Sequence, residues 1–533
     1  MSTAEFGSTA LTTRRVVFLL IGAASPMAGV VGNVPLALVY GNGVGLPAMF
    51  LVSTVILLCF TVGYAAMSRR VVNTGAFYTY VAFGLGRTPA IGVAYLAVVS
   101  YTALTLGYAG GFGYFVKLVL GSVGVTVPWV VASMFALAVV GILGYRSVAL
   151  SARVIAVLMV IEFAALLIMN GGILTNKGAD ALPLESLTPH AVAAGSIGVG
   201  LVFALTSFVG FESGALYGEE AVDPRRSVSR ATYIAVVVLG AFFFLTSWLV
   251  VGALGVDNAR SDAQSQLGML LLNIAEANVS PVLFDAMGVL MCTGMLASML
   301  AIHGAASRYL FALGRDRVLP SALGRYHARH LSPHIASLTV TTIGTVVVLS
   351  FALAGAHPYL TLATSMVGLS TLGVVLLQAF AALAVVVFFV RRREGNYLRT
   401  VVAPAIGCVG LVVAFVLTVV HFSTLIGTTN PIITNLPWLL GVVVLAGFGA
   451  GLWMRSSRPA PYAAAHARAS ATPVRASATP SPQSYVSPAH QQAPAHQQAP
   501  AHQQAPAPQH QGRHAVNDYN AFDAETAQQH IVR

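Results

Sequence analysis

The chain has little charge and little cysteine. Only 8% of its 533 residues are Asp, Glu, Lys or Arg, whereas 56% are hydrophobic, and its mean hydropathy is +0.78. This composition excludes a fold around one water-soluble core of ordinary make-up. The three cysteines, Cys59, Cys292 and Cys408, all fall within apolar runs, so no disulfide framework is expected. The chain therefore belongs in a lipid bilayer.

The sequence contains many long apolar runs with few charged residues. A helix that crosses about 30 Å of hydrocarbon needs about 20 mostly apolar residues. The runs are too long and too evenly apolar for barrel strands, whose polarity alternates over about ten residues. We therefore predict an all-α integral membrane protein whose twelve transmembrane helices cover approximately residues 16–40, 45–67, 89–120, 126–144, 150–173, 190–218, 231–255, 282–313, 334–354, 358–390, 401–423 and 434–455.

The net charge of +11 is explained by where the cations lie rather than by a nucleic-acid partner. With the N-terminus in the cytoplasm, 21 of the 28 Lys and Arg residues fall in or beside cytoplasmic segments, three fall outside, and four lie in the C-terminal tail. This asymmetry is the positive-inside rule. The first apolar run continues through Pro35 to Tyr40 and is longer than the apolar core of a typical signal peptide, which favours an uncleaved span. We expect a multi-pass protein of the cell membrane with both termini cytoplasmic.

The two ends of the chain differ from the membrane part. Residues 1–15 are expected to form a cytoplasmic N-terminus and residues 16–455 the twelve-helix membrane domain. Residues 456–533, rich in Ala, Pro, Ser, Gln and His, include three copies of AHQQAP between Ala489 and Pro506. A segment with so little to bury is expected to be a disordered cytoplasmic tail. Its spaced histidines would give a poorly organised metal site, so no metal site is predicted.

Two apolar runs contain residues that disfavour a continuous helix. The first reads IGAASPMAGVVGNVPLALVYGNG, with the break expected at about Met27–Gly32, and the sixth is interrupted at Gly210 and Gly214. Non-helical backbone at membrane depth occurs only where it is buried in protein or lines a wet cavity. Matched interruptions in two halves indicate a transporter with inverted repeats and a substrate site at the midplane. We predict repeats of five helices over about 16–173 and 190–390, broken in helices one and six, with two extra helices at 401–455. For the sixth run alone, close glycine packing explains the pattern equally well.

Three stretches resemble the amino acid, polyamine and organocation (APC) permease superfamily. SFVGFESGALYGEEAVDPRRSVSRATYIAV, residues 207–236, is similar to its sixth helix and following loop, with a Gly-x-Glu-Ser core. AASRYLFALGRDRVLPSALGRYHARHLSPHIASL (305–338) is similar to the loop between helices eight and nine, and NTGAFYTYVAFGLGR (73–87) to the segment between helices two and three. The resemblance covers about residues 15–455, and it implies a leucine-transporter-like bundle.

The chain departs from that family at two places. The family often has a proline where Ser229 stands, and the unwound part of its first helix commonly contains Gly-Ser-Gly, where this chain has SPMAGVVG. The resemblance also implies roles for two acidic residues. A glutamate at the position of Glu212 acts near the site or its gate, and a charged residue in helix five, here Glu162, stands in for the sodium ion of related carriers.

The substrate is expected at the two interruptions. A broken helix exposes backbone N–H groups and a positive dipole end, which suits a carboxylate. Hydroxyl groups there are candidate partners, although such groups often bond to their own helix. The predicted substrate-binding residues are Ser25, Met27, Ala28, Gly29, Val30, Thr206, Ser207, Phe208, Val209 and Gly210.

Ionisable residues within the spans are predicted to couple transport to protons. An ionisable group at membrane depth is expensive, and burial favours the protonated carboxyl. Glu212 is the first candidate, and Glu162 and His303 are the others; each has a structural alternative as a neutral, hydrogen-bonded interior group. A cytoplasmic gate is also predicted, with Glu219 or Glu220 bonding to Arg14 or Arg15. Such surface pairs contribute only about 0 to 1 kcal/mol.

These features predict a secondary active transporter for an amino acid or a related amine. No nucleophile with its base, metal cluster, cofactor motif or phosphate-binding loop occurs in the spans, so we expect neither an enzyme nor an ATP-driven pump, and no cofactor. The partners are a small-molecule substrate, protons and lipid. Four alternatives stay open: an amine or polyamine exchanger, a sensor signalling through the tail, sodium coupling, and a homodimer. A channel would need regular polar rings, and a major-facilitator protein would repeat after six helices rather than five.

Overall fold

The computed structural model describes residues 12–71, 76–146, 152–214, 223–327, 329–330, 332–426 and 430–457. Within these ranges the secondary structure is helical and contains no β-strand. The predicted C-terminal tail falls almost wholly outside them, as do the first eleven residues. The all-α prediction is thus confirmed for the part of the chain that the structure describes.

Eleven helical stretches within the described ranges are long and apolar enough to cross a membrane. A shorter apolar helix, α7, coincides with the fourth predicted segment. The stretches agree with the predicted segments to within several residues at each end. The principal elements are α2 (Thr13–Ala24), η1 (Ala28–Gly32), α3 (Val34–Tyr40), α4 (Leu46–Arg70), α5 (Ala76–Gly84), α6 (Arg87–Ser122), α7 (Trp129–Tyr145), α8 (Ala152–Lys177), α9 (Pro189–Ala193), α10 (Ile197–Phe208), α11 (Pro224–Leu254), α12 (Ala259–Gln266), α13 (Leu270–Asn278), α14 (Pro281–Arg315), α15 (His334–Leu353), η8 (Pro358–Ala363), α16 (Thr364–Arg392), η9 (Leu398–Val402), α17 (Ala403–Val420), α18 (Phe422–Ile426), α19 (Pro431–Thr434) and α20 (Leu436–Ser457).

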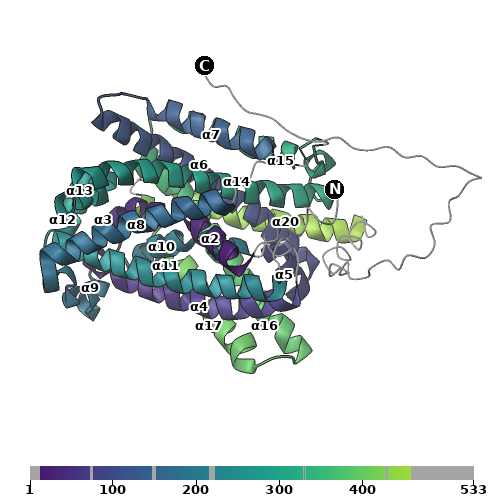
Figure 1. Ribbon diagram of the computed structural model, residues 1–533. Helices are drawn as coiled ribbons and strands as arrows, with labels where there is room; N and C mark the ends of the chain where they lie inside the picture. Colours follow the sequence, from purple (N-terminus) through teal and green to yellow (C-terminus); the bar gives the residue numbers. More distant parts are fainter. Residues whose placement is uncertain are drawn as a thin grey trace, which may run out of the picture. The chain divides into compact units, whose positions relative to one another are not determined.

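The long helices run side by side, and α2 and α10 lie among them (Figure 1). In the most apolar 18-residue window of each helix, 89% of the residues are buried in the stretch Ile197–Gly214, compared with 22% in Leu436–Ser457. The helix α6 packs against α14, α16, α20 and α7, whereas α2 packs against α8 and α11. The sixth segment is therefore central, and the last helix presents most of its apolar surface outward, as a lipid-facing helix does.

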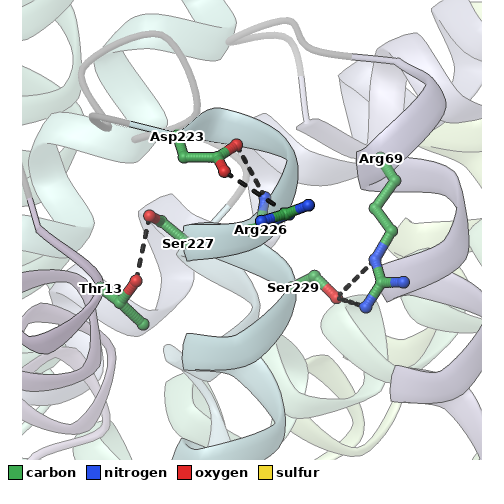
Figure 2. Close-up of polar contacts among 6 residues, drawn as sticks. All are labelled: Thr13, Arg69, Asp223, Arg226, Ser227 and Ser229. Carbon is green, nitrogen blue, oxygen red and sulfur yellow. Dashed lines mark hydrogen bonds and ion pairs between the residues drawn. The ribbon is translucent and has the colours of Figure 1, made fainter.

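The helix α11 begins earlier than predicted, at Pro224 rather than near residue 231. In the sequence, the pair Asp223-Pro224 is equally compatible with the end of a helix. In the structure Asp223 caps the helix, because its side chain accepts a hydrogen bond from the Arg226 N–H group. Proline fits the first helical position, where its missing N–H group is not needed. The same carboxylate lies 3.8 Å from the Arg226 guanidinium. Figure 2 draws both contacts between Asp223 and Arg226 as dashed lines.

The early start of α11 brings two of its serines against neighbouring helices (Figure 2). The Thr13 hydroxyl of α2 donates a hydrogen bond to the Ser227 hydroxyl at 3.0 Å. The Arg69 guanidinium at the end of α4 donates to the Ser229 hydroxyl through Nε and Nη2, at 3.2 and 3.1 Å. The serine that stands where the resembling family often has proline thus joins α4 to α11.

Candidate functional site

The first membrane segment is interrupted at Ser25. The helix α2 ends at Ala24, and Ser25 takes a left-handed conformation with φ 47° and ψ 83°. After Pro26 and Met27 the backbone continues as a π-helical turn, η1, before α3. Of the expected interruption at Met27–Gly32, the structure shows the π-helical turn, and the break in the α-helical ladder lies two residues earlier.

The sixth segment is interrupted at Val209 and Gly210. The helix α10 ends at Phe208, Val209 is extended with ψ 125°, and Gly210 has φ 120°. That φ value is open to glycine and strained for residues with a Cβ atom. The chain then makes a short turn over residues 211–214, beyond which it is not described until Asp223.

The two interruptions touch each other. A Cβ atom placed at Gly210 would lie 2.6 Å from the carbonyl carbon of Ala23, so only glycine fits. One turn earlier, the Ser207 hydroxyl donates a 2.9 Å hydrogen bond to the Gly29 carbonyl oxygen. The Asn33 amide in turn donates to the Ser207 hydroxyl at 3.0 Å. The first and sixth segments are thus in contact at their interruptions, through the backbones of Ala23 and Gly210 and through the Ser207 side chain.

A cavity lies beside these interruptions, lined by the first segment, α6, α10, α14, η8, α16 and α18. It offers about 40 Å³ to the centres of water molecules, which is room for about three waters. Its lining contains no Asp, Glu, Lys, Arg or His among the described residues. Its larger apolar side chains are Leu36, Phe115, Val202, Phe203, Met291, Met295, Val367 and Leu425.

Six polar side chains line the cavity, and most of them are already paired. The Thr206, Ser207, Tyr359 and Thr364 hydroxyls all bond to backbone carbonyl oxygens. The Tyr108 hydroxyl and the Asn33 carbonyl oxygen have no hydrogen-bond partner within the described ranges. Both residues line the cavity, so a bound substrate or a water molecule there could pair with these two groups.

Four of the ten predicted substrate-binding residues line this cavity, namely Ala28, Gly29, Thr206 and Ser207. The other six, Ser25, Met27, Val30, Phe208, Val209 and Gly210, are not in its lining. Several backbone N–H groups among the ten residues are paired within the chain. Gly29 donates to the Ser25 carbonyl oxygen, and Met27 and Gly210 donate to carboxylates. Sequence analysis missed Tyr108 and Tyr359, and it noted Asn33 only as a residue that disfavours a helix.

Glu212 lies at the second interruption and is buried, with 1% of its surface exposed. One carboxyl oxygen accepts the Gly210 N–H group at 2.9 Å, and the other accepts the Tyr101 hydroxyl of α6 at 3.1 Å. The Tyr64 hydroxyl of α4 donates to the Glu212 backbone carbonyl oxygen at 2.9 Å. Glu212 is therefore a buried ionisable group that also accepts a hydrogen bond from the backbone at the interruption of the sixth segment.

Glu162 of α8 lies at the first interruption. Its carboxyl oxygen accepts the Met27 N–H group at 3.3 Å, and Gly294 of α14 packs directly against the carboxyl group. The two predicted proton carriers thus flank the cavity from opposite interruptions without lining it.

The remaining predicted residues lie elsewhere. His303 is buried between helices, where its Nε2 atom pairs with the Ser337 hydroxyl of α15 at 3.0 Å and its ring packs near Gly144 of α7. Arg14 and Arg15 are exposed, and Glu219 and Glu220, their predicted gate partners, lie outside the described residues. Nowhere in the described ranges do three His, Cys, Asp or Glu side chains lie where they could hold a metal ion.

Comparison with known proteins agrees with this architecture. The model of the amino acid permease family matches residues 9–448. The chain is 24% identical over 402 residues to the branched-chain amino acid permease BcaP of Lactococcus lactis subsp. cremoris, which covers 70% of this chain and 82% of that protein. It is 24% identical over 320 residues to the low-affinity putrescine importer PlaP of Escherichia coli K12, covering 57% and 66%.

A third relative is the uncharacterized transporter Rv1999c of Mycobacterium tuberculosis, which is 27% identical over 376 residues, covering 70% of this chain and 78% of that protein. The family match spans well over half of the chain, and the described part holds many helices of membrane-spanning length. The relatives are named as carriers rather than enzymes. The chain therefore belongs to the amino acid permease family, as a multi-pass membrane permease and not an enzyme.

Proposed function

We propose that the chain is a proton-coupled secondary active transporter for a neutral amino acid with an apolar side chain. It works by alternating access around the cavity between the two interrupted segments, with the leucine-transporter-like arrangement of five-plus-five helices and both termini in the cytoplasm. The observation that carries the proposal is the cavity itself. It lies where segments one and six lose their helical regularity, and its walls, as far as the structure describes them, carry no ionisable side chain other than tyrosine.

The cavity walls favour an apolar side chain over a second amino group. Met291, Met295, Val202 and Phe203 give the substrate apolar contacts. A diamine would place a second ammonium group against these walls, and a buried charge without a partner is strongly unfavourable. A neutral amino acid is also consistent with the name of the branched-chain amino acid permease relative, whereas the putrescine importer relative gives the competing expectation.

The two unpaired groups suit the two ends of an amino acid. The Asn33 carbonyl oxygen can only accept hydrogen bonds, so it matches the substrate ammonium group. The Tyr108 hydroxyl can donate, so it matches the carboxylate. Hydrogen bonds to charged groups contribute more than those between neutral groups, about 1.5–3 kcal/mol each.

Glu212 is the proposed carrier of the coupled proton. Its carboxyl group bonds to the Gly210 N–H group, and Gly210 rests on the backbone of Ala23. A change in the charge of Glu212 therefore acts on the contact between the two interruptions. Glu162 bonds to Met27 on the other side of that contact and is proposed as the second member of the proton relay. His303 is not needed by this mechanism.

Uptake by purified protein in liposomes tests the proposal. Radiolabelled leucine, valine, lysine and putrescine are compared under an imposed pH gradient, acid outside, and without a gradient. We expect gradient-dependent uptake of leucine or valine, competed by other neutral apolar amino acids and not by putrescine. Uptake of putrescine in preference to leucine and valine would identify an amine carrier. If uptake were the same with and without the pH gradient, transport would not be coupled to protons.

A further inference from the structure

His357 caps the turn that leads into the tenth membrane segment. It is exposed, and it precedes Pro358, the first residue of η8. Its Nδ1 atom accepts hydrogen bonds from the N–H groups of Tyr359, at 3.2 Å, and Leu360, at 3.1 Å. An imidazole that accepts at Nδ1 is neutral and carries its proton on Nε2. Protonation of Nδ1 would remove both hydrogen bonds at once.

Tyr359, held by this cap, is a wall of the substrate cavity. Its hydroxyl donates a 2.6 Å hydrogen bond to the Gly32 carbonyl oxygen at the end of η1. Its ring stacks on Tyr114 of α6, with centroids 4.7 Å apart and planes 9° apart. It therefore ties the first segment, the third and the tenth together at the η8 end of the cavity.

The cavity must widen at this end to admit a substrate from outside. Its present room of about three waters is smaller than an amino acid, and η1, which Tyr359 holds through Gly32, is one of its walls. Breaking the bond between Tyr359 and Gly32 frees the π-helical turn from η8. Tyr359 is thus placed as a lid that has to move in each cycle.

The charged and titratable groups around His357 are few. On α6 they are Lys117 and Tyr114, and on its own segment Tyr359, with Tyr40 of α3 beside Tyr359. No described carboxylate acts on the ring. Partial burial and the Lys117 ammonium together hold the pKa of His357 below its usual value. The neutral, capping form is therefore favoured while the lid is closed.

We propose that His357 is a positioning residue that opens the Tyr359 lid when the outer solution turns acid. Protonation withdraws the cap from the Tyr359 and Leu360 N–H groups, adds a second cation beside Lys117, and loosens the turn that holds the Tyr359 ring over the cavity. The assignment of this end to the outer face rests on the proposed function and orientation. The proton on His357 is not transported, in contrast to the proton proposed for Glu212.

The sign of the effect follows from linkage. Because the closed conformation binds a proton at His357 less readily than an open one in which the ring faces water, a falling pH favours the open conformation. The shift toward the open conformation should occur over the pH range in which imidazole titrates, about pH 5 to 7. It acts from one side of the membrane only, the side opposite the N-terminus.

Tracer exchange in right-side-out vesicles separates this effect from proton-driven transport. Leucine is present at equal concentration on both sides, the inner pH is fixed, the membrane potential is clamped, and the outer pH is stepped from about 8 to about 5. We expect wild-type exchange to rise several-fold as the outer solution is acidified. His357→Asn keeps a capping oxygen that does not titrate, so its exchange should stay low and flat. His357→Ala lacks the cap, so its exchange should be high at every pH. A His357→Asn profile as steep as wild type would overturn the proposal.

Accessibility of the cavity gives a readout that needs no substrate. A single cysteine replaces Leu36, a cavity residue, in a chain whose three native cysteines are alanine. Labelling from outside by a membrane-impermeant methanethiosulfonate is compared at each pH with the same chain carrying His357→Asn, which cancels the pH dependence of the thiol itself. We expect the ratio of the two labelling rates to rise several-fold on acidification, and a constant ratio would refute the lid. This result stands even if no amino acid is transported, so failure of the proposed function and failure of the lid can be told apart.

Discussion

The backbone of Gly210 lies directly on the backbone of Ala23. A Cβ atom at Gly210 would come within 2.6 Å of both the carbonyl carbon and the carbonyl oxygen of Ala23. The contact joins the two membrane segments at the points where each leaves its helix. It leaves room for no side chain, and it requires a φ angle of 120° that suits glycine.

Gly210→Ala should therefore damage transport. Backbone strain alone costs about 1–3 kcal/mol, to which the clash with Ala23 adds. Since 1.4 kcal/mol corresponds to a factor of ten, we expect substrate affinity or transport rate to fall by about tenfold or more. Initial uptake rates in liposomes measure this.

Gly214→Ala is the matched control for that substitution. A Cβ atom there would meet only side-chain atoms of Leu20 and Thr232, at 3.3 Å, and these side chains can adjust. Its uptake should stay near wild type. If both substitutions were equally harmful, the contact with Ala23 would not be the cause.

Asn33→Leu should weaken substrate binding. The substitution removes the carbonyl oxygen assigned to the substrate ammonium group, a hydrogen bond to charge of about 1.5–3 kcal/mol, so KM should rise by about tenfold or more. Asn33→Asp should shift preference toward cationic substrates. Thr364→Val is the control, because the Thr364 hydroxyl is already paired with the Tyr359 carbonyl oxygen. A KM unchanged in Asn33→Leu would remove Asn33 from the site.

Glu162→Ala should destabilise the fold around the first interruption. It leaves the buried Met27 N–H group without its carboxylate acceptor, and an unsatisfied buried donor costs about 1–3 kcal/mol. Glu162→Gln keeps an acceptor oxygen and should unfold close to the wild-type temperature. Thermal unfolding in detergent compares the two, and equal losses in both variants would show that the hydrogen bond to Met27 is unimportant.

Thr13→Val and Ser227→Ala should be coupled in a double-mutant cycle. The two hydroxyls bond to each other across α2 and α11, so either substitution alone removes the same interaction, worth about 0.5–1.5 kcal/mol. Pairing Thr13→Val with Ser229→Ala serves as control, since Ser229 bonds to Arg69 instead. Additive effects in the first pair would show that the hydroxyls do not interact in the membrane.

The membrane helices were predictable because each one depends on a single property, an apolar run long enough to span lipid. The start of α11 was harder to predict from the sequence. Asp223-Pro224 is as good a helix start as a helix stop, and the choice depends on whether Asp223 finds the Arg226 N–H group. The interruption at Ser25 was displaced for a similar reason, because glycines show where a helix can break and not where it does.

The cavity was only partly predictable. Sequence analysis selected Ser207 and Thr206 as hydroxyls beside an interruption, and the structure pairs both with carbonyl oxygens of their own helix. Asn33 and Tyr108 were passed over because unpaired groups are recognised only when all neighbours are known. The pair Tyr101 and Tyr108, seven residues apart on one face of α6, was the available signal.

The most direct test of the central claim compares two modes of transport in Glu212→Gln. Glutamine keeps an acceptor oxygen for the Gly210 N–H group but cannot release a proton, so leucine counterflow should persist while uptake driven by a pH gradient, with its substrate-dependent proton entry, disappears. If Glu212→Gln retains gradient-driven uptake and proton entry at the wild-type rate, Glu212 does not carry the proton and the proposed coupling at the two interruptions is wrong.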